Sequence, residues 1–269
     1  RWGAPLRHGE MTDAMWELLH SGSGLLGEPF IMGQTAENLA KKYNISRQEQ
    51  DQVAFESHSK AIAAIDSGRF KDEIIPVPIP QRKGAPKMFD TDEHPRRDIS
   101  LESLAQLKPV FDKNGTVTAA NSSGLNDGAA ALVITSAKKA KEIGAKPLAR
   151  IAANAIAGCE PHLMGYGPVP AVQKLLKKTG KKLDDIDLIE ANEAFAAQYL
   201  ACEKGLGLDR KKVNVNGSGI ALGHPVGCTG ARLMVSLIHE MKKRKSRQGI
   251  ATLCVGGGMG AAVLIENLD

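Results

Sequence analysis

Residues 214–225 read NVNGSGIALGHP. Pro225 restricts His224 to an extended backbone, and the glycines let another backbone or a ligand approach closely. A predicted helix begins soon after, so backbone N–H groups and a positive dipole lie near the loop. A strand, a glycine-rich loop and a helix in this order predict an α/β fold. His224 is a candidate functional residue, and the alternative is a purely structural histidine.

Alternating strand and helix patterns surround this loop. Strands are predicted over 148–157, 188–190, 213–216, 250–255 and 261–266, and helices over 168–178, 193–204 and 232–242. This alternation indicates a layered α/β domain. In the N-terminal half, helices are predicted over 11–19, 35–43, 48–67 (opened by a Ser46–Glu49 capping box) and 136–143, an extended edge over 74–79, a loop over 81–98 and a strand over 116–119. The apolar run 129–134 fits either a helix or a buried strand.

Composition limits the function classes. The chain has 269 residues, of which 42% are hydrophobic, 24% charged and 4% aromatic, which excludes collagen-like and wholly disordered proteins. No apolar run is long enough to span a membrane. The net charge of +5 permits an anionic substrate, and scarce aromatic residues argue against nucleic-acid binding. The four cysteines form no CxxC pair, so we expect no zinc site, no disulfide framework and a reducing compartment.

Two further motifs lie at predicted strand ends. Residues 190–195 read EANEAF and span the junction of a strand and a helix, where Asn192 is either part of a ligand site or the helix N-cap. Residues 254–260 read CVGGGMG, and Cys254 ends an apolar strand there. Buried cysteines are commonly inert. The exposed N–H groups of a glycine run beside a thiol nevertheless suit an oxyanion hole.

The order Asn-Glu-Ala-Phe, Gly-His-Pro, Cys-x-Gly-Gly-Gly resembles the thiolase family. Matching segments extend over essentially the whole chain and include residues 32–38, 68–74, 82–84 and 115–119. The resemblance implies a thiolase-like layered α/β/α fold and the acetyl-CoA acetyltransferase type of activity. Such an acyltransferase forms or cleaves acetoacetyl-CoA or another 3-ketoacyl-CoA. Acyl-CoA and CoA are then substrate and product, and neither a resident cofactor nor a metal is implied.

The resemblance also implies roles for single residues. His224 corresponds to the base that activates a nucleophilic cysteine. Cys254 corresponds to a second cysteine, which moves a proton to or from the acetyl-CoA methyl carbon. His224 and a water held by Asn192 match the oxyanion hole for the enolate, and Gly256 matches a donor to the acyl intermediate.

Substrate-binding residues and domains follow from the same resemblance. Ser123 and Gly124 match contacts to the pantetheine, and Arg82 and Lys83 match the region near the nucleotide and its phosphates. The walls around the acyl group match Met32, Met164 and Phe195, which could otherwise be ordinary core residues. The implied domains are a loop domain for CoA binding and oligomerisation (1–117), a segment completing an N-terminal thiolase domain (118–146) and a C-terminal thiolase domain (147–269). Residues 1–15 match a tetramerisation loop, so a homo-oligomer, dimer or tetramer, is implied.

One departure from the family pattern concerns the nucleophile. The family's acyl-carrying cysteine lies upstream, and no cysteine precedes Cys159 here. With the non-methionine start, this leads us to expect a fold incomplete at its N-terminus, and a chain that is inactive alone and prone to aggregate through unpaired strands. The alternatives are one half of a split thiolase with a separate N-terminal fragment, a catalytically dead acyl-CoA-binding subunit, and a β-ketoacyl synthase relative, against which the Cys-x-Gly-Gly-Gly motif argues. The expected compartment is the cytoplasm, with a mitochondrion or another organelle as the alternative.

Overall fold

A four-stranded mixed sheet forms the centre of the computed structural model, which describes residues 20–21 and 30–268. Its strands lie in the order β5 (Ala149–Gly158), β8 (Met259–Asn267), β7 (Gln248–Val255) and β6 (Leu188–Ala191). β6 and β7 are parallel, whereas β8 is antiparallel to both neighbours. Four of the five strands predicted for the C-terminal half are thereby confirmed. Residues 213–216 make only isolated bridges.

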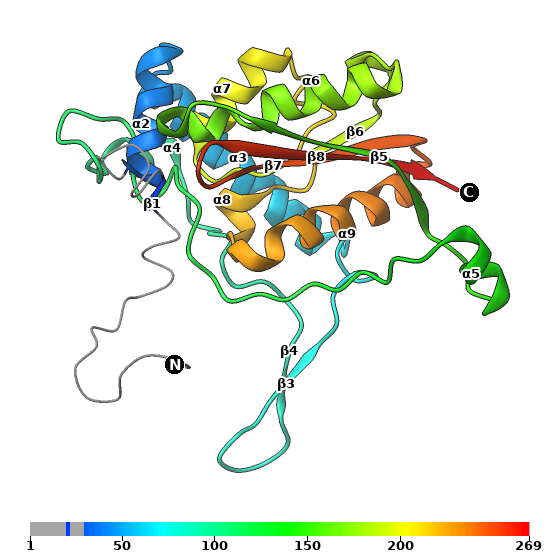
Figure 1. Cartoon of the computed structure of the whole chain (residues 1–269). Helices are drawn as coiled ribbons and strands as arrows, with labels where there is room; N and C mark the ends of the chain where they lie inside the picture. Colours follow the sequence, from blue (N-terminus) through cyan, green and yellow to red (C-terminus); the bar gives the residue numbers. More distant parts are fainter. Residues whose placement is uncertain (1–19, 22–29, 269) are drawn as a thin grey trace, which may run out of the picture.

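Helices cover both faces of this sheet (Figure 1). α6 (Pro168–Thr179) packs on β5 and β8, and α9 (Val226–Arg244) lies across β6 and β7 on the opposite face. α6 begins with proline and ends at Gly180, whose φ of 67° suits a helix C-terminus. α9 begins six residues before the predicted start, directly after the Gly-His-Pro triplet. The predicted layered α/β/α fold is confirmed.

The N-terminal helices pack beside the loops that carry the motifs. α3 (Arg47–Asp66) contacts α7 (Ala196–Leu206) and α8 (Gly219–Leu222), and α2 (Met32–Lys42) contacts α7 and the 3-10 helix η1 (Pro161–Tyr166). The capping box predicted for α3 is present, because Ser46 Oγ accepts from Glu49 N and the Glu49 carboxylate accepts from Ser46 N. One apolar core joins these helices to the sheet.

The segment from 116 to 136 differs from the prediction. Residues 123–136 form neither helix nor strand, and the apolar run 129–134 is not buried: Val133 is 96% exposed and Ile134 70%. Residues 116–119 form no strand, because the Asn121 side chain binds Thr118 N and Thr116 O and closes a polar turn. α5 (Ala137–Glu142) follows as predicted.

The remaining elements are short. They are β1 (His20–Ser21), β2 (Phe30–Ile31), β3 (Val77–Ile79), β4 (Lys87–Phe89), α4 (Leu101–Ala105) and the 3-10 helix η2 (Leu183–Asp185). β3 and β4 pair into a hairpin that projects from the body of the molecule, where the sequence predicted a loop over 81–98 (Figure 1). The helix predicted over 11–19 and the tetramerisation loop at 1–15 lie outside the described residues. No helix in the described ranges is long and apolar enough to cross a membrane.

Candidate active site

Two of the three motifs meet because β6 and β7 are parallel neighbours. The register pairs Ala191 with Thr252, and Asn192 N donates to Thr252 O at 3.0 Å. Cys254 lies two residues further, at the end of β7, and Gly256 follows in the turn between β7 and β8. The carboxyl ends of neighbouring parallel strands share one edge, where open α/β sheets bind their ligands.

Asn192 joins this edge to the Gly-His-Pro loop. Its Nδ2 lies 3.3 Å from His224 Nε2, and the residue is only 2% exposed. Its Oδ1 is buried and has no hydrogen-bond partner among the described residues. α7 begins at Ala196 with Phe195 as its N-cap, so the alternative that Asn192 caps this helix is wrong. Its amide is directed at the candidate histidine instead.

Thr229 fixes the protonation pattern of His224. Thr229 Oγ1 lies 2.6 Å from His224 Nδ1 and 3.0 Å from Pro225 O. Because a carbonyl only accepts, the hydroxyl proton goes to Pro225, and Thr229 accepts from Nδ1–H. The neutral imidazole then presents its Nε2 lone pair to the Asn192 amide, which donates to it. Thr229 is fully buried, so solvent does not compete for this arrangement.

The electrostatic surroundings keep His224 neutral. Burial, followed by the positive charge of Arg232, lowers the pKa of His224 to about 4. A neutral imidazole can accept a proton at Nε2 at physiological pH. The ring therefore has the state required of a base.

The segment predicted to contact pantetheine packs against both motifs. Ser123 N donates to Ala194 O at 2.9 Å, and Gly124 O accepts from His224 N at 3.1 Å. Asn126 Oδ1 also accepts from His224 N, at 3.2 Å. A Cβ on Gly124 would lie 2.5 Å from His94 Nε2 and 2.9 Å from this Oδ1, so a larger residue would displace these two side chains. The structure therefore brings Ser123 and Gly124 beside the Asn192 and His224 loops.

Cys254 is a protonated thiol at neutral pH. Burial raises its pKa to about 12, and the neighbouring Cys159 adds to the shift. The end of β5 closes over the glycine turn here, since Cys159 N donates to Gly258 O at 2.7 Å. Gly257 and Gly258 have φ of 85° and 92°, a conformation that favours glycine. The turn that carries Gly256 is therefore held by the strands β7 and β8 that it joins and by the hydrogen bond from Cys159.

The other predicted substrate residues lie in four separate parts of the fold. Phe195 packs edge-on against Phe111 with ring centroids 6.0 Å apart, Met164 is buried in η1, and Met32 opens α2 half-buried. Arg82 and Lys83 lie exposed at the tip of the projecting β3–β4 hairpin, away from the motif loops (Figure 1). No contact in the described residues joins this tip to His224. The substrate-binding roles of all five stay predictions.

Thr229 and Asn126 were missed from the sequence. Each lies within five residues of a predicted site residue, Thr229 after His224 and Asn126 after Gly124. The sequence signal for Thr229 was its position: a hydroxyl residue about one turn into the helix that follows the candidate base. Only the three-dimensional contact shows that it meets Nδ1.

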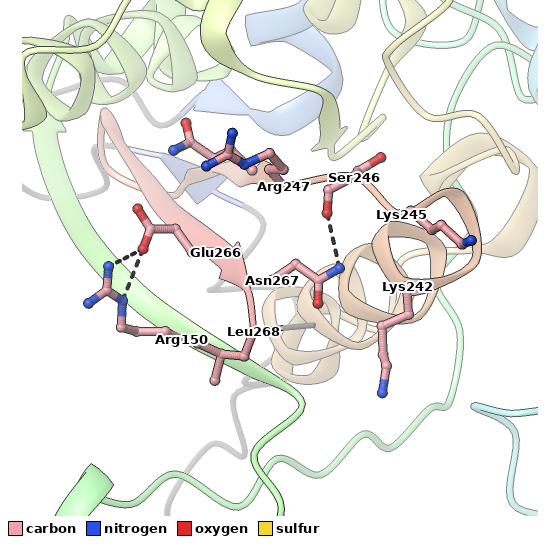
Figure 2. Close-up of a pocket in the computed structure, with 9 residues that line it drawn as sticks. Arg150, Lys242, Lys245, Ser246, Arg247, Glu266, Asn267 and Leu268 are labelled. Carbon is pink, nitrogen blue, oxygen red and sulfur yellow. Dashed lines mark hydrogen bonds and ion pairs between the residues drawn. The ribbon is translucent and has the colours of Figure 1, made fainter.

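A broad cavity lies at the far end of α9 (Figure 2). Arg150 binds Glu266 there, and Asn267 Nδ2 donates to Ser246 O at 3.1 Å. The lining is polar, and none of the predicted site residues belongs to it. The candidate active site is therefore the edge at β6 and β7.

Comparisons with known proteins identify the family of the chain. The family model "Thiolase, N-terminal domain" matches residues 4–138, and "Thiolase, C-terminal domain" matches residues 145–267. The acetyl-CoA acetyltransferase of Pseudomonas aeruginosa is 54% identical over 265 residues, which are 98% of this chain and 67% of that protein. That of Thiocystis violacea is 52% identical and covers 98% of this chain and 65% of its own length. The chain spans about two thirds of the length of these relatives.

Solved structures give the same result. The Bacillus anthracis acetyl-CoA acetyltransferase superposes with a TM-score of 0.91 at 57% identity, over 100% of this chain and 67% of that one. The human mitochondrial 3-ketoacyl-CoA thiolase in complex with CoA gives a TM-score of 0.86 at 42% identity, over 99% and 66%. The fold and both family models agree, and the chain belongs to the thiolase family.

Proposed function

We propose that this chain carries the enolate-binding and proton-transfer part of a thiolase active site. The enzyme would form or cleave acetoacetyl-CoA or another 3-ketoacyl-CoA. The observation that carries the proposal is the Asn192–His224–Thr229 arrangement at the edge that also holds Cys254. The names of the similar proteins, acetyl-CoA acetyltransferase and 3-ketoacyl-CoA thiolase, support this activity.

The proposed cleavage needs a group that stabilises an enolate. A cysteine thiolate attacks the ketone carbon, the bond between the α and β carbons breaks, and acetyl-CoA leaves as its enolate. The acyl-carrying cysteine would be none of the four in this sequence. Once His224 Nε2 has taken the proton of the attacking cysteine, its N–H would donate to the enolate oxygen, together with a water bound to the buried Asn192 Oδ1. An acceptor with no protein partner at the site is suited to binding such a water.

Cys254 would supply the proton that ends the cleavage. The leaving enolate takes one proton at its α carbon, and a thiol with a pKa of about 12 holds its proton at neutral pH. In the synthetic direction, the same group would have to lose this proton first.

The substrate would be coenzyme A in its acylated and free forms. The pantetheine would lie along Ser123 and Gly124, which contact the catalytic loops, and the nucleotide would meet Arg82 and Lys83. The proposed reaction uses no resident metal or cofactor. We further propose a cytoplasmic homo-oligomer, and the four free cysteines support a reducing compartment.

Thiolysis of acetoacetyl-CoA tests the proposal. The gene product and this chain alone are assayed side by side for loss of acetoacetyl-CoA in the presence of CoA. Activity in the gene product but not in this chain is the expected result. Activity of this chain alone would show that one of its own thiols carries the acyl group, and the role given to Cys254 would be wrong. No activity in either would favour the acyl-CoA-binding subunit.

A further inference from the structure

The Gly223–His224 peptide group is held from both sides. Arg232 Nη1 donates to Gly223 O at 3.1 Å, while His224 N donates to Gly124 O and Asn126 Oδ1. The carbonyl and the N–H belong to one planar unit. Hydrogen bonds to its two ends therefore fix the direction in which the imidazole leaves the backbone. Gly223 has a φ of 87°, so the peptide takes an orientation that other residues adopt at a cost.

The Arg232 side chain that makes this hydrogen bond is largely buried. Its Nη2 is buried and has no hydrogen-bond partner in the described part of the chain. The guanidinium lines a small cavity together with Glu190, Ser218 and Ser236. Glu190 is only 5% exposed and lies on β6, two residues before Asn192. Burial raises the pKa of Glu190 to about 8, and the positive charge of Arg232 opposes that shift. Arg232 thus joins α9 to the Gly-His-Pro loop by a hydrogen bond and lines a cavity with Glu190 of β6.

The charge of Arg232 also acts on the imidazole. After burial, it is the second cause of the lowered pKa of His224. The titratable groups that face Arg232 are Glu190, Asp92, Cys228 and Glu193. Loss of the positive charge would raise the pKa of His224, whereas loss of the hydrogen bond alone would leave it low. The two contributions can therefore be separated by substitution.

We propose that Arg232 is a positioning residue for His224, which holds the Gly223–His224 peptide and places a fixed positive charge beside the imidazole. The kinetic part of this inference rests on the proposed function, and the charge part does not. Arg232 is not a catalytic residue in this account, because it reaches the reacting atoms only through His224.

The experiment uses three variants of the gene product. Arg232→Met removes the donor and the charge, and Arg232→Lys keeps the charge without the planar donor fork. Arg232→Met combined with Glu190→Gln removes the arginine charge together with the buried titratable carboxyl beside it, so the proposal stays testable if the single variant fails to fold. Arg150→Met removes an exposed arginine far from the site and serves as the control. Thiolysis kinetics and the NMR titration of the His224 imidazole, assigned by its loss in His224→Gln, are measured for each.

The variants are expected to separate the two effects. Arg232→Met should lower kcat about 10-fold or more with little change in KM, and should raise the His224 pKa by about 0.5 unit or more. Arg232→Lys should keep the low pKa and recover only part of kcat. A wild-type kcat in Arg232→Met would overturn the proposal. So would a loss of kcat that is the same in Arg232→Met and Arg232→Lys while the His224 pKa stays unchanged. If the wild type lacks thiolysis, the proposed function fails, and the titration still decides whether Arg232 acts on His224.

Discussion

At the scale of single residues, the two ring nitrogens of His224 have different neighbours. Nδ1 donates to a buried threonine, whose own proton is committed to a carbonyl, and Nε2 faces an asparagine amide. This order of donors selects one tautomer before any substrate binds. The ring therefore needs no change of tautomer to accept a proton at Nε2.

Replacing Thr229 tests this order. Thr229→Val keeps the shape but removes the acceptor for Nδ1–H, and a buried donor without a partner disfavours the working tautomer. We expect kcat for thiolysis to fall about 10- to 100-fold with KM nearly unchanged, and Thr229→Ser to restore most of it. Thr179 makes a similar hydroxyl-to-carbonyl bond on α6, so Thr179→Val is the control. Equal kcat in Thr229→Val and the wild type would contradict the tautomer argument.

Glu73 gives a pH dependence of stability. Burial raises its pKa from 4.5 to about 7, although Ser236 donates to it at 3.1 Å. A carboxyl whose pKa is higher in the folded state stabilises fully below the unfolded pKa, and this contribution is lost as pH rises through about 7. Glu73→Gln should therefore reduce the drop in Tm between pH 5 and pH 8. The exposed Glu142→Gln is the control, and an identical drop in Glu73→Gln and the wild type would contradict this account.

At the scale of elements, a close backbone contact fixes the glycine turn after Cys254. A Cβ on Gly260 would lie 2.0 Å from Gly167 O, and a Cβ on Gly167 would lie 2.2 Å from Met259 O. Both obstacles are backbone atoms, which cannot move aside as a flexible side chain can. The start of β8 is therefore locked to the start of α6, and with it the turn that carries Gly256.

Alanine at position 260 should disrupt this close backbone contact between β8 and α6. We expect Gly260→Ala to lower the free energy of unfolding by about 3 kcal/mol or more, measured by urea unfolding. Gly227→Ala is the matched control, because a Cβ there meets no atom within 4 Å and its site on α9 favours alanine. A loss below about 1 kcal/mol in Gly260→Ala would show that the two elements can separate at little cost.

At the scale of the whole molecule, apolar side chains are exposed along one long segment and one sheet edge. Val133 and Ile134 lie in the extended segment 123–136, and Ile156, 64% exposed, lies on the edge strand β5. Exposed edges and apolar patches of this kind promote association between chains. That the chain alone is prone to aggregate stays a prediction, and these exposed side chains are its physical basis.

Polar residues in this segment should reduce that tendency. Val133→Ser combined with Ile134→Ser should lower light scattering and the binding of an apolar dye by this chain alone, because the pair contributes apolar surface without core contacts. Lys211→Ser, an exposed position with no apolar side chain, should change neither signal. Unchanged scattering in the double variant would place the association elsewhere.

Sequence patterns predicted the parts of the fold that local chemistry determines. Periodicity and capping residues predicted the capping box at Ser46, four strands of the C-terminal half and the positions of the motifs at strand ends. The structure of the apolar run 129–134 could not be predicted in this way. An apolar sequence indicates a buried segment only where neighbouring elements cover it. Asn192 was ambiguous for a related reason: a helix N-cap and a buried site amide have the same sequence signal. The contact of Thr229 with His224 depends on the exact turn of α9.

The most direct test of the central claim is proton exchange at the methyl carbon of acetyl-CoA. Acetyl-CoA is incubated in D₂O with the gene product, and deuterium in the methyl group is followed by mass spectrometry. The account predicts exchange by the wild type, a loss of about 100-fold in Cys254→Ser, and a marked loss in Asn192→Ala and His224→Gln. Undiminished exchange in Cys254→Ser would contradict the claim that this thiol moves the proton at the enolate carbon.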